Sequence, residues 1–123
     1  MILNNLAVLY STENEIDKAK EIYEEAIAIG KQLADINPKT YLPEVEITLN
    51  NLAALHYVIN KFEKAEKKYQ EVITINKQLK EGNSQTYLPN IEMTMNNLGF
   101  LYSAKNEFGK AKKAEEESFS IYK

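Results

Sequence analysis

The stretch "TYLPEVEITLNNLAAL", residues 40–55, returns 46 residues later as "TYLPNIEMTMNNLGFL", residues 86–101. The ending of this phrase also occurs upstream, as "NNLAVL" from Asn4. When residues 4–49 are aligned with residues 50–95, nearly half of the positions are identical and no gap is needed. Such a regular internal spacing is typical of repeat proteins, in which one structural unit stacks on the next.

Each period contains two helices that can be predicted from the spacing of their apolar residues. In the first helix, Leu49, Leu52, Ala53 and His56 fall at positions i, i+3, i+4 and i+7, on one helical face. The second helix has an equivalent face, formed by Ala19, Tyr23, Ala26 and Ile27. Short polar breaks, such as residues 11–15 and 59–60, predict tight connections between antiparallel helices.

The two prolines of the repeated phrase predict where the first helix of a period begins. Proline is favoured at the first helical position, because its missing N–H would have no partner there, and its ring disfavours a helical residue before it. The sequence therefore predicts helix starts at Pro43 and at Pro89. The second helix is expected to continue through "KQLADIN", residues 31–37.

Composition and charge limit the classes of partner. The chain has 15 basic and 18 acidic residues and a net charge of -3, so we expect no nucleic-acid and no membrane partner. It has no cysteine, which excludes disulfides and thiolate metal sites and suits the cytoplasm. No apolar run approaches the roughly 20 residues that a membrane span needs. We expect a soluble, cytoplasmic protein.

The residues that catalysis would require are also missing. The one histidine, His56, takes a position that Tyr10 and Tyr102 fill in the other copies, which indicates a packing role. The serines have no base to activate them, and the four scattered glycines form no phosphate loop. The run Glu115–Glu117 points in several directions on a helix, as a solvated surface does. We expect no enzyme activity, no cofactor and no metal.

The pattern of small and aromatic residues resembles a known repeat family. Each period has small residues at two fixed places, an aromatic residue in each helix and a Leu beside the first small residue, as in the tetratricopeptide repeat. The phrase "TLNNLAALH" with "FEKAEKKYQEVI", residues 62–73, is especially similar to the longer repeats of kinesin light chains and their bacterial relatives. The resemblance covers essentially the whole chain.

This resemblance implies the fold and the domain organisation. We expect an all-α protein, a right-handed superhelical solenoid of three helix-turn-helix repeats with a period of 46 residues. The period is longer than the common one of about 34 residues. Residues 1–123 would form a single array, with repeats at about 1–38, 39–84 and 85–123.

A pair of asparagines precedes the core Leu in every first helix. Asparagine is a mediocre helix former, so its recurrence in mid-helix requires another explanation. First helices of stacked hairpins line the concave side, where a carboxamide can bridge the backbone of an extended peptide. In the tetratricopeptide family the asparagine directly before the Leu often contacts the peptide backbone, and here it corresponds to Asn5, Asn51 and Asn97.

The expected groove contains no basic residue, which predicts a neutral and partly apolar surface. The alternative is that the amides only tie adjacent helices together. The residues predicted to line the groove are Asn5, Val8, Ile47, Asn50, Asn51, Ala54, Tyr57, Val58, Met93, Asn96, Asn97, Phe100 and Ser103.

The sequence pattern is compatible with two functions. The first is a non-enzymatic interaction module that holds a peptide or a partner helix, of unknown identity, in its concave groove. The second is a self-assembly element that associates through Ile2, Leu3 and Leu6, or a piece of a larger scaffold with further repeats before Met1. The lysines of residues 61–68 alternate with glutamates, which indicates ordinary pairing on a helix surface.

Overall fold

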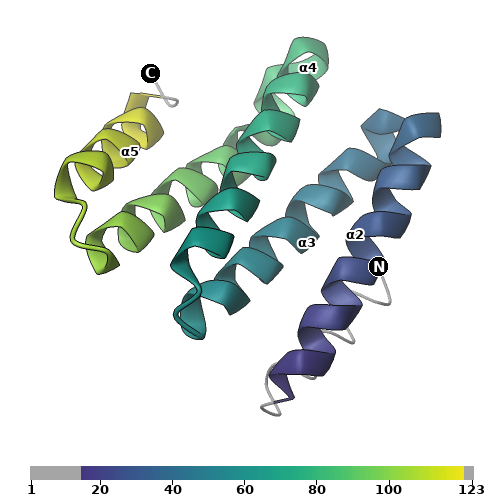
Figure 1. Ribbon diagram of the computed structural model, residues 1–123. Helices are drawn as coiled ribbons and strands as arrows, with labels where there is room; N and C mark the ends of the chain where they lie inside the picture. Colours follow the sequence, from purple (N-terminus) through teal and green to yellow (C-terminus); the bar gives the residue numbers. More distant parts are fainter. Residues whose placement is uncertain (1–14, 121–123) are drawn as a thin grey trace.

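The computed structural model describes the backbone of residues 15–120 and, within them, the side chains of residues 15–79, 92–107, 109–114 and 116–117. This part of the chain consists of helices α2 (Ile16–Ile36), α3 (Pro38–Val58), α4 (Phe62–Ala104) and α5 (Phe108–Ser120), with no strand. Each helix packs against the next one in the chain (Figure 1). The fold is an all-α solenoid of helical hairpins.

Helix α4 reverses its direction near the middle. A straight helix of 43 residues would be about 65 Å long, and residues 36 positions apart would be separated by about 54 Å. Yet the hydroxyl of Tyr102 donates to Oε2 of Glu66 over 2.6 Å. The first and second halves of α4 therefore lie side by side, as the teal and green segments in Figure 1 do.

The core forms two clusters along the stack. The first joins α2, α3 and the first half of α4, around Ala19, Tyr23, Leu49, Leu52 and Val72. The second joins the end of α3, both halves of α4 and α5, around Ala53, Ala65, Tyr69, Leu98, Leu101 and Ala114. All eight residues that the sequence placed on the core faces of the first two helices are buried, so these faces are confirmed.

Each of two tight connections between hairpin helices contains an asparagine with a left-handed backbone conformation. Asn60 and Asn106, 46 residues apart, have φ angles of 63° and 61°, which asparagine tolerates better than most residues. At the first turn, the N–H of Lys61 donates to the carbonyl of His56 over 2.7 Å. The break predicted at residues 59–60 is therefore confirmed.

The predicted helix starts at Pro43 and Pro89 are wrong. Helix α3 already begins at Pro38, and the side chain of Asn37 caps it by accepting from the N–H of Thr40 over 3.3 Å. Pro43 lies inside α3, and Pro89 lies inside α4. Pro38 keeps Asn37 out of a helical conformation, with φ -141° and ψ 85°. In the next copy Ser84 takes the place of Pro38, and the backbone at this position stays within α4.

Candidate interaction surface

A row of exposed and half-buried residues runs along α3 and the second half of α4. On α3 it contains Ile47, Asn51, Ala54 and Val58, and on α4 it contains Met93, Asn97 and Phe100, which we call the α3–α4 stripe. Ile47 and Met93, equivalent residues of successive periods, are each 47% exposed, and Val58 and Phe100 are 70% and 66% exposed. Of these large apolar residues, Ile47 and Met93 recur at the repeat spacing, whereas alanines occupy the positions equivalent to Val58 and Phe100.

Helix geometry places the stripe opposite the core. Its members on α3 follow one another at intervals of four, three and four residues, which keeps them on one narrow side of a helix with 3.6 residues per turn. Leu49, Leu52 and His56 lie on the other side and are buried. The stripe contains no charged residue, as the sequence predicted for the groove.

The structure corrects the assignment of Asn50 to the groove. Asn50 is only 6% exposed, and its Oδ1 accepts a hydrogen bond from the hydroxyl of Thr94 over 3.1 Å. This bond joins α3 to the second half of α4, so the amide ties adjacent helices together. Successive helical residues point about 100° apart, which is why Asn51 stays on the stripe while its neighbour turns into the interface.

The remaining predicted residues fall into three groups. Tyr57 is half-buried, and its ring lies 5.6 Å from that of Phe62 in the hairpin. Asn96 and Ser103 are exposed, and Asn96 occupies the position equivalent to the buried Asn50. Asn5 and Val8 lie outside the described residues.

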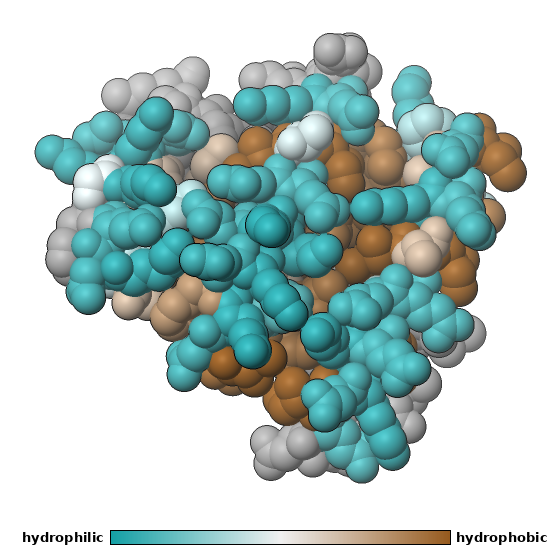
Figure 2. All heavy atoms as spheres, in the orientation of Figure 1, coloured by the Kyte–Doolittle hydropathy of each residue, from teal (hydrophilic) through white to brown (hydrophobic). Residues whose placement is uncertain are grey.

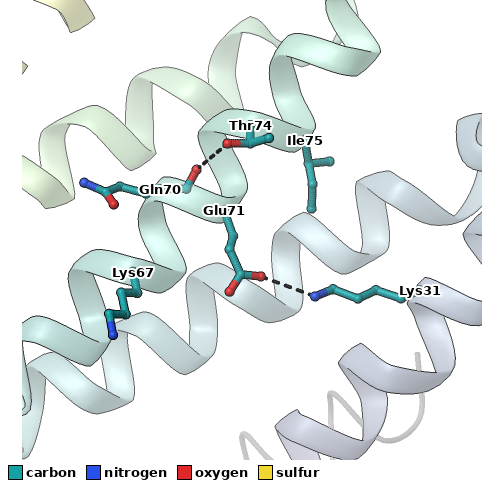
Figure 3. A pocket seen from close by; sticks show the side chains of 6 residues that line it. All are labelled: Lys31, Lys67, Gln70, Glu71, Thr74 and Ile75. Carbon is teal, nitrogen blue, oxygen red and sulfur yellow. Dashed lines mark hydrogen bonds and ion pairs between the residues drawn. The ribbon is translucent and has the colours of Figure 1, made fainter.

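The opposite face of the stack is polar and hollowed. It carries α2, the first half of α4 and α5, which lie toward the viewer in Figure 1, and Figure 2 shows hydrophilic side chains over most of it. A cavity of about 470 Å³ lies between α2 and α4, where Lys31 reaches Glu71 over 3.4 Å (Figure 3). Two further crevices lie on this face, one beside His56 and one beside Tyr102.

Within the described side chains, no three His, Asp or Glu residues come together as a possible metal site. His56 is 2% exposed and lies between α2 and α4, as a packing role requires. Over residues 15–120, no helix is both long enough and apolar enough to cross a membrane.

Comparison with known families agrees with the helical hairpins. Models of the tetratricopeptide repeat match residues 44–123 and residues 1–37. The chain belongs to the tetratricopeptide repeat family. This tetratricopeptide array is also similar to the crystal structure of BtubC (BKLC) from P. vanneervenii, with a TM-score of 0.75 and 27% sequence identity. The match covers 98% of this chain and 44% of the BtubC chain. A search of curated proteins finds no match.

This neighbour confirms the resemblance to kinesin-light-chain-like repeats, because BtubC is a bacterial protein of that kind. Tetratricopeptide repeats are non-catalytic modules that mediate contacts between proteins. The family thus accounts for the scaffold and for a general role in protein interaction. The surface that receives a partner depends on this chain's own residues.

Proposed function

We propose that this tetratricopeptide array is a non-enzymatic interaction module that holds an extended peptide or a helical segment of a partner protein along the α3–α4 stripe. The observation that supports the proposal most strongly is the exposure of Ile47, Val58, Met93 and Phe100 on one side of the stack, opposite the core. Large apolar residues gathered on a surface are typical of protein interaction sites.

The amides of the stripe complement its apolar residues. Asn51 and Asn97 are half-buried members of the stripe and stand 46 residues apart. A carboxamide can both donate to and accept from a peptide backbone, whatever the side chains of that peptide are. The apolar residues would then select apolar side chains of the partner, and the amides would align its backbone.

The length of the stripe sets the size of the bound segment. From Ile47 to Val58 a helix rises about 16 Å, which equals about five residues of an extended peptide. The proposed ligand is therefore a short, uncharged segment with two or more apolar side chains. We place this activity in the cytoplasm, consistent with a chain that has no cysteine.

A peptide-display library tests the proposal, because it samples many sequences and needs no identified partner. Peptides enriched on the intact protein should be apolar, and their affinity should fall at least about tenfold for an Asn51→Ala, Asn97→Ala variant and for Phe100→Ser. The midpoint of thermal unfolding should change little for Phe100→Ser, because Phe100 is 66% exposed.

Ile36→Ser provides the matched control for this experiment. Ile36 is an apolar residue that is 83% exposed and lies at the end of α2, outside the stripe. Its substitution should leave peptide affinity unchanged. Peptides that bind the stripe variants as tightly as the intact protein would refute the proposal.

Self-assembly is the rival function. The residues on which it depends, Ile2, Leu3 and Leu6, lie outside the described residues. Light scattering over a range of protein concentrations distinguishes the two: a constant monomer mass favours the interaction module, and a mass that rises with concentration favours assembly.

A further inference from the structure

The crevice beside His56 lies on the face opposite the α3–α4 stripe. It has a volume of about 250 Å³, and one water molecule takes up about 30 Å³ in the liquid, so a tetrahedral oxyanion fits. Helix α2, helix α3 and the first half of α4 all contribute to its walls. The residues that line this His56 crevice are Lys20, Glu24, His56, Lys64, Lys67, Lys68 and Glu71.

His56 is a buried polar group with an unmet hydrogen-bonding capacity. The side chain is 2% exposed, and its Nδ1 has no hydrogen-bond partner in the described part of the chain. Leaving a buried polar atom unpaired is costly, so such an atom in a folded protein often marks a missing ligand or water. Burial lowers the pKa of His56, and the nearby Lys20, Lys64 and Lys68 lower it further. Burial and these lysines thus favour the neutral imidazole, and the carboxylate of Glu24 opposes them.

The charges around His56 are unbalanced. Four lysines line the crevice against two glutamates. Glu71 is already engaged, since Lys31 approaches it to 3.4 Å and Lys68 to 3.5 Å. Lys20, Lys64 and Lys67 form no ion pair with any described residue. Like charges held together repel one another, and a bound anion relieves that repulsion.

The crevice beside Tyr102, in the next period, can be compared with the His56 crevice position by position. Each of the seven positions that line the His56 crevice has its equivalent, 46 residues later, in the crevice beside Tyr102. There Glu66 replaces Lys20 and Tyr102 replaces His56, and the tyrosine hydroxyl donates to the carboxylate over 2.6 Å. Lys105 approaches the same Glu66 to 3.6 Å.

The Tyr102 crevice is therefore satisfied within the protein. At the seven equivalent positions it carries two lysines, Lys110 and Lys113, against two glutamates, Glu66 and Glu117. The stack thus does not require a basic crevice at this place in the repeat. The histidine and the additional lysines are particular to the His56 crevice, since the equivalent positions of the next period carry other residues.

We propose that the His56 crevice binds a phosphate group, either free phosphate or the phosphorylated side chain of a protein partner. The lysines supply positive charge from both walls, on α2 and α4. With its proton on Nδ1, the imidazole at the floor would donate a hydrogen bond to a phosphate oxygen and so orient the anion. This site is independent of the α3–α4 stripe and lies on another face of the stack.

Titration with inorganic phosphate at constant ionic strength, followed by nuclear magnetic resonance of the backbone amides, tests the site. Saturable shifts should centre on His56, Lys20 and Lys64. The Lys64→Glu variant should bind phosphate at least about tenfold more weakly, because Lys64 is exposed and its charge is reversed at the crevice. Lys39→Glu makes the same charge change at an exposed position of α3 outside the crevice and should change affinity less than about twofold.

A double variant reproduces the Tyr102 crevice at this site. Lys20→Glu with His56→Tyr installs the pair that Glu66 and Tyr102 form, so it should fold and lose phosphate binding. If phosphate gives no saturable shift near His56, or if Lys39→Glu weakens binding as much as Lys64→Glu, the proposal is wrong.

A phosphoserine peptide and its unphosphorylated form then identify the source of the phosphate. Tighter binding of the phosphopeptide than of inorganic phosphate supports a modified partner. Equal binding of the two supports a free phosphate ligand. Equal binding of the phosphorylated and unphosphorylated peptides would contradict the proposed site.

Discussion

The side-chain amide of Asn76 donates a hydrogen bond to Oε2 of Glu46 over 2.9 Å, and both residues are buried between α3 and α4. Glu46 is fully buried, and its Oε1 has no partner in the described part of the chain. Burial raises the pKa of Glu46 to about 7, although the bond from Asn76 works against this shift. A titratable group is thus enclosed in the contact between successive repeats.

We expect stability to decrease as the pH rises from about 5 to 7. In this range folded Glu46 keeps a proton that the unfolded chain releases, since its pKa rises from 4.5 to about 7 on folding. The decrease should reach up to about 3 kcal/mol in the free energy of unfolding. The Glu46→Gln variant should lack this component and be more stable than the parent at pH 8. Urea unfolding at pH 5 and pH 8 measures the free energy of unfolding of the parent and of the variant. If this free energy changes between the two pH values by the same amount in Glu46→Gln as in the parent, the assignment to Glu46 is wrong.

The bond between Asn50 and Thr94 should contribute measurably to stability. Replacing Asn50 with Ala removes the acceptor of a buried hydroxyl and should lower the free energy of unfolding by about 1–2 kcal/mol. Asn96→Ala is the matched control, because Asn96 is the exposed equivalent in the next period and should cost less than about 0.5 kcal/mol. Chemical denaturation compares the two, and equal losses would show that the buried amide has no special role.

The contact between Tyr102 and Glu66 should stabilise the reversal of α4. Tyr102→Phe removes only the hydroxyl that donates to the carboxylate, and we expect a loss of about 1–2 kcal/mol. Tyr57→Phe removes the hydroxyl of a half-buried tyrosine that forms no hydrogen bond with the described residues, and it should have almost no effect. Thermal unfolding of both variants tests this difference.

Two helical glycines should respond in opposite ways to alanine. A Cβ on Gly30 would lie 2.8 Å from Cγ2 of the buried Val45, so Gly30→Ala should destabilise the protein by about 1–2 kcal/mol. A Cβ on Gly109 meets nothing within 4 Å, and Gly109→Ala should stabilise α5 by up to about 1 kcal/mol. Calorimetry gives the direction of each change. Stabilisation by both substitutions would mean that α2 and α3 can move apart without cost.

The repeat pattern predicted the core because burial follows helical periodicity. Residues such as Leu49 and Ala65 lie on faces that only a neighbouring helix can cover, so their spacing alone reveals them. The helix starts were less predictable, since "NPKTYLP" contains two prolines and the earlier one ends the connection. A capping asparagine directly before Pro38 was the available signal.

Whether a position on the helix surface is buried or exposed depends on packing between repeats. The pattern within a single helix does not reveal this packing. Asn50 and Asn51 look equivalent in sequence, yet only contact with the next helix decides that Asn50 turns inward. The lysines of α4 looked like ordinary surface pairs until α2 brought Lys20 beside them. The reversal from Lys20 to Glu66 at equivalent positions of two periods was a signal that direct comparison of the copies could have detected.

Among the described helices, close backbone packing joins only those that follow one another in the chain, and none joins α2 to α5. Tension applied to the two ends would therefore reach every hairpin in series, with no direct contact between the first and last helices to share the load. Such a chain should lengthen in steps, one hairpin at a time, and regain its length as each hairpin closes again. We therefore expect the stack to extend and recoil when a pulling force acts on its two ends.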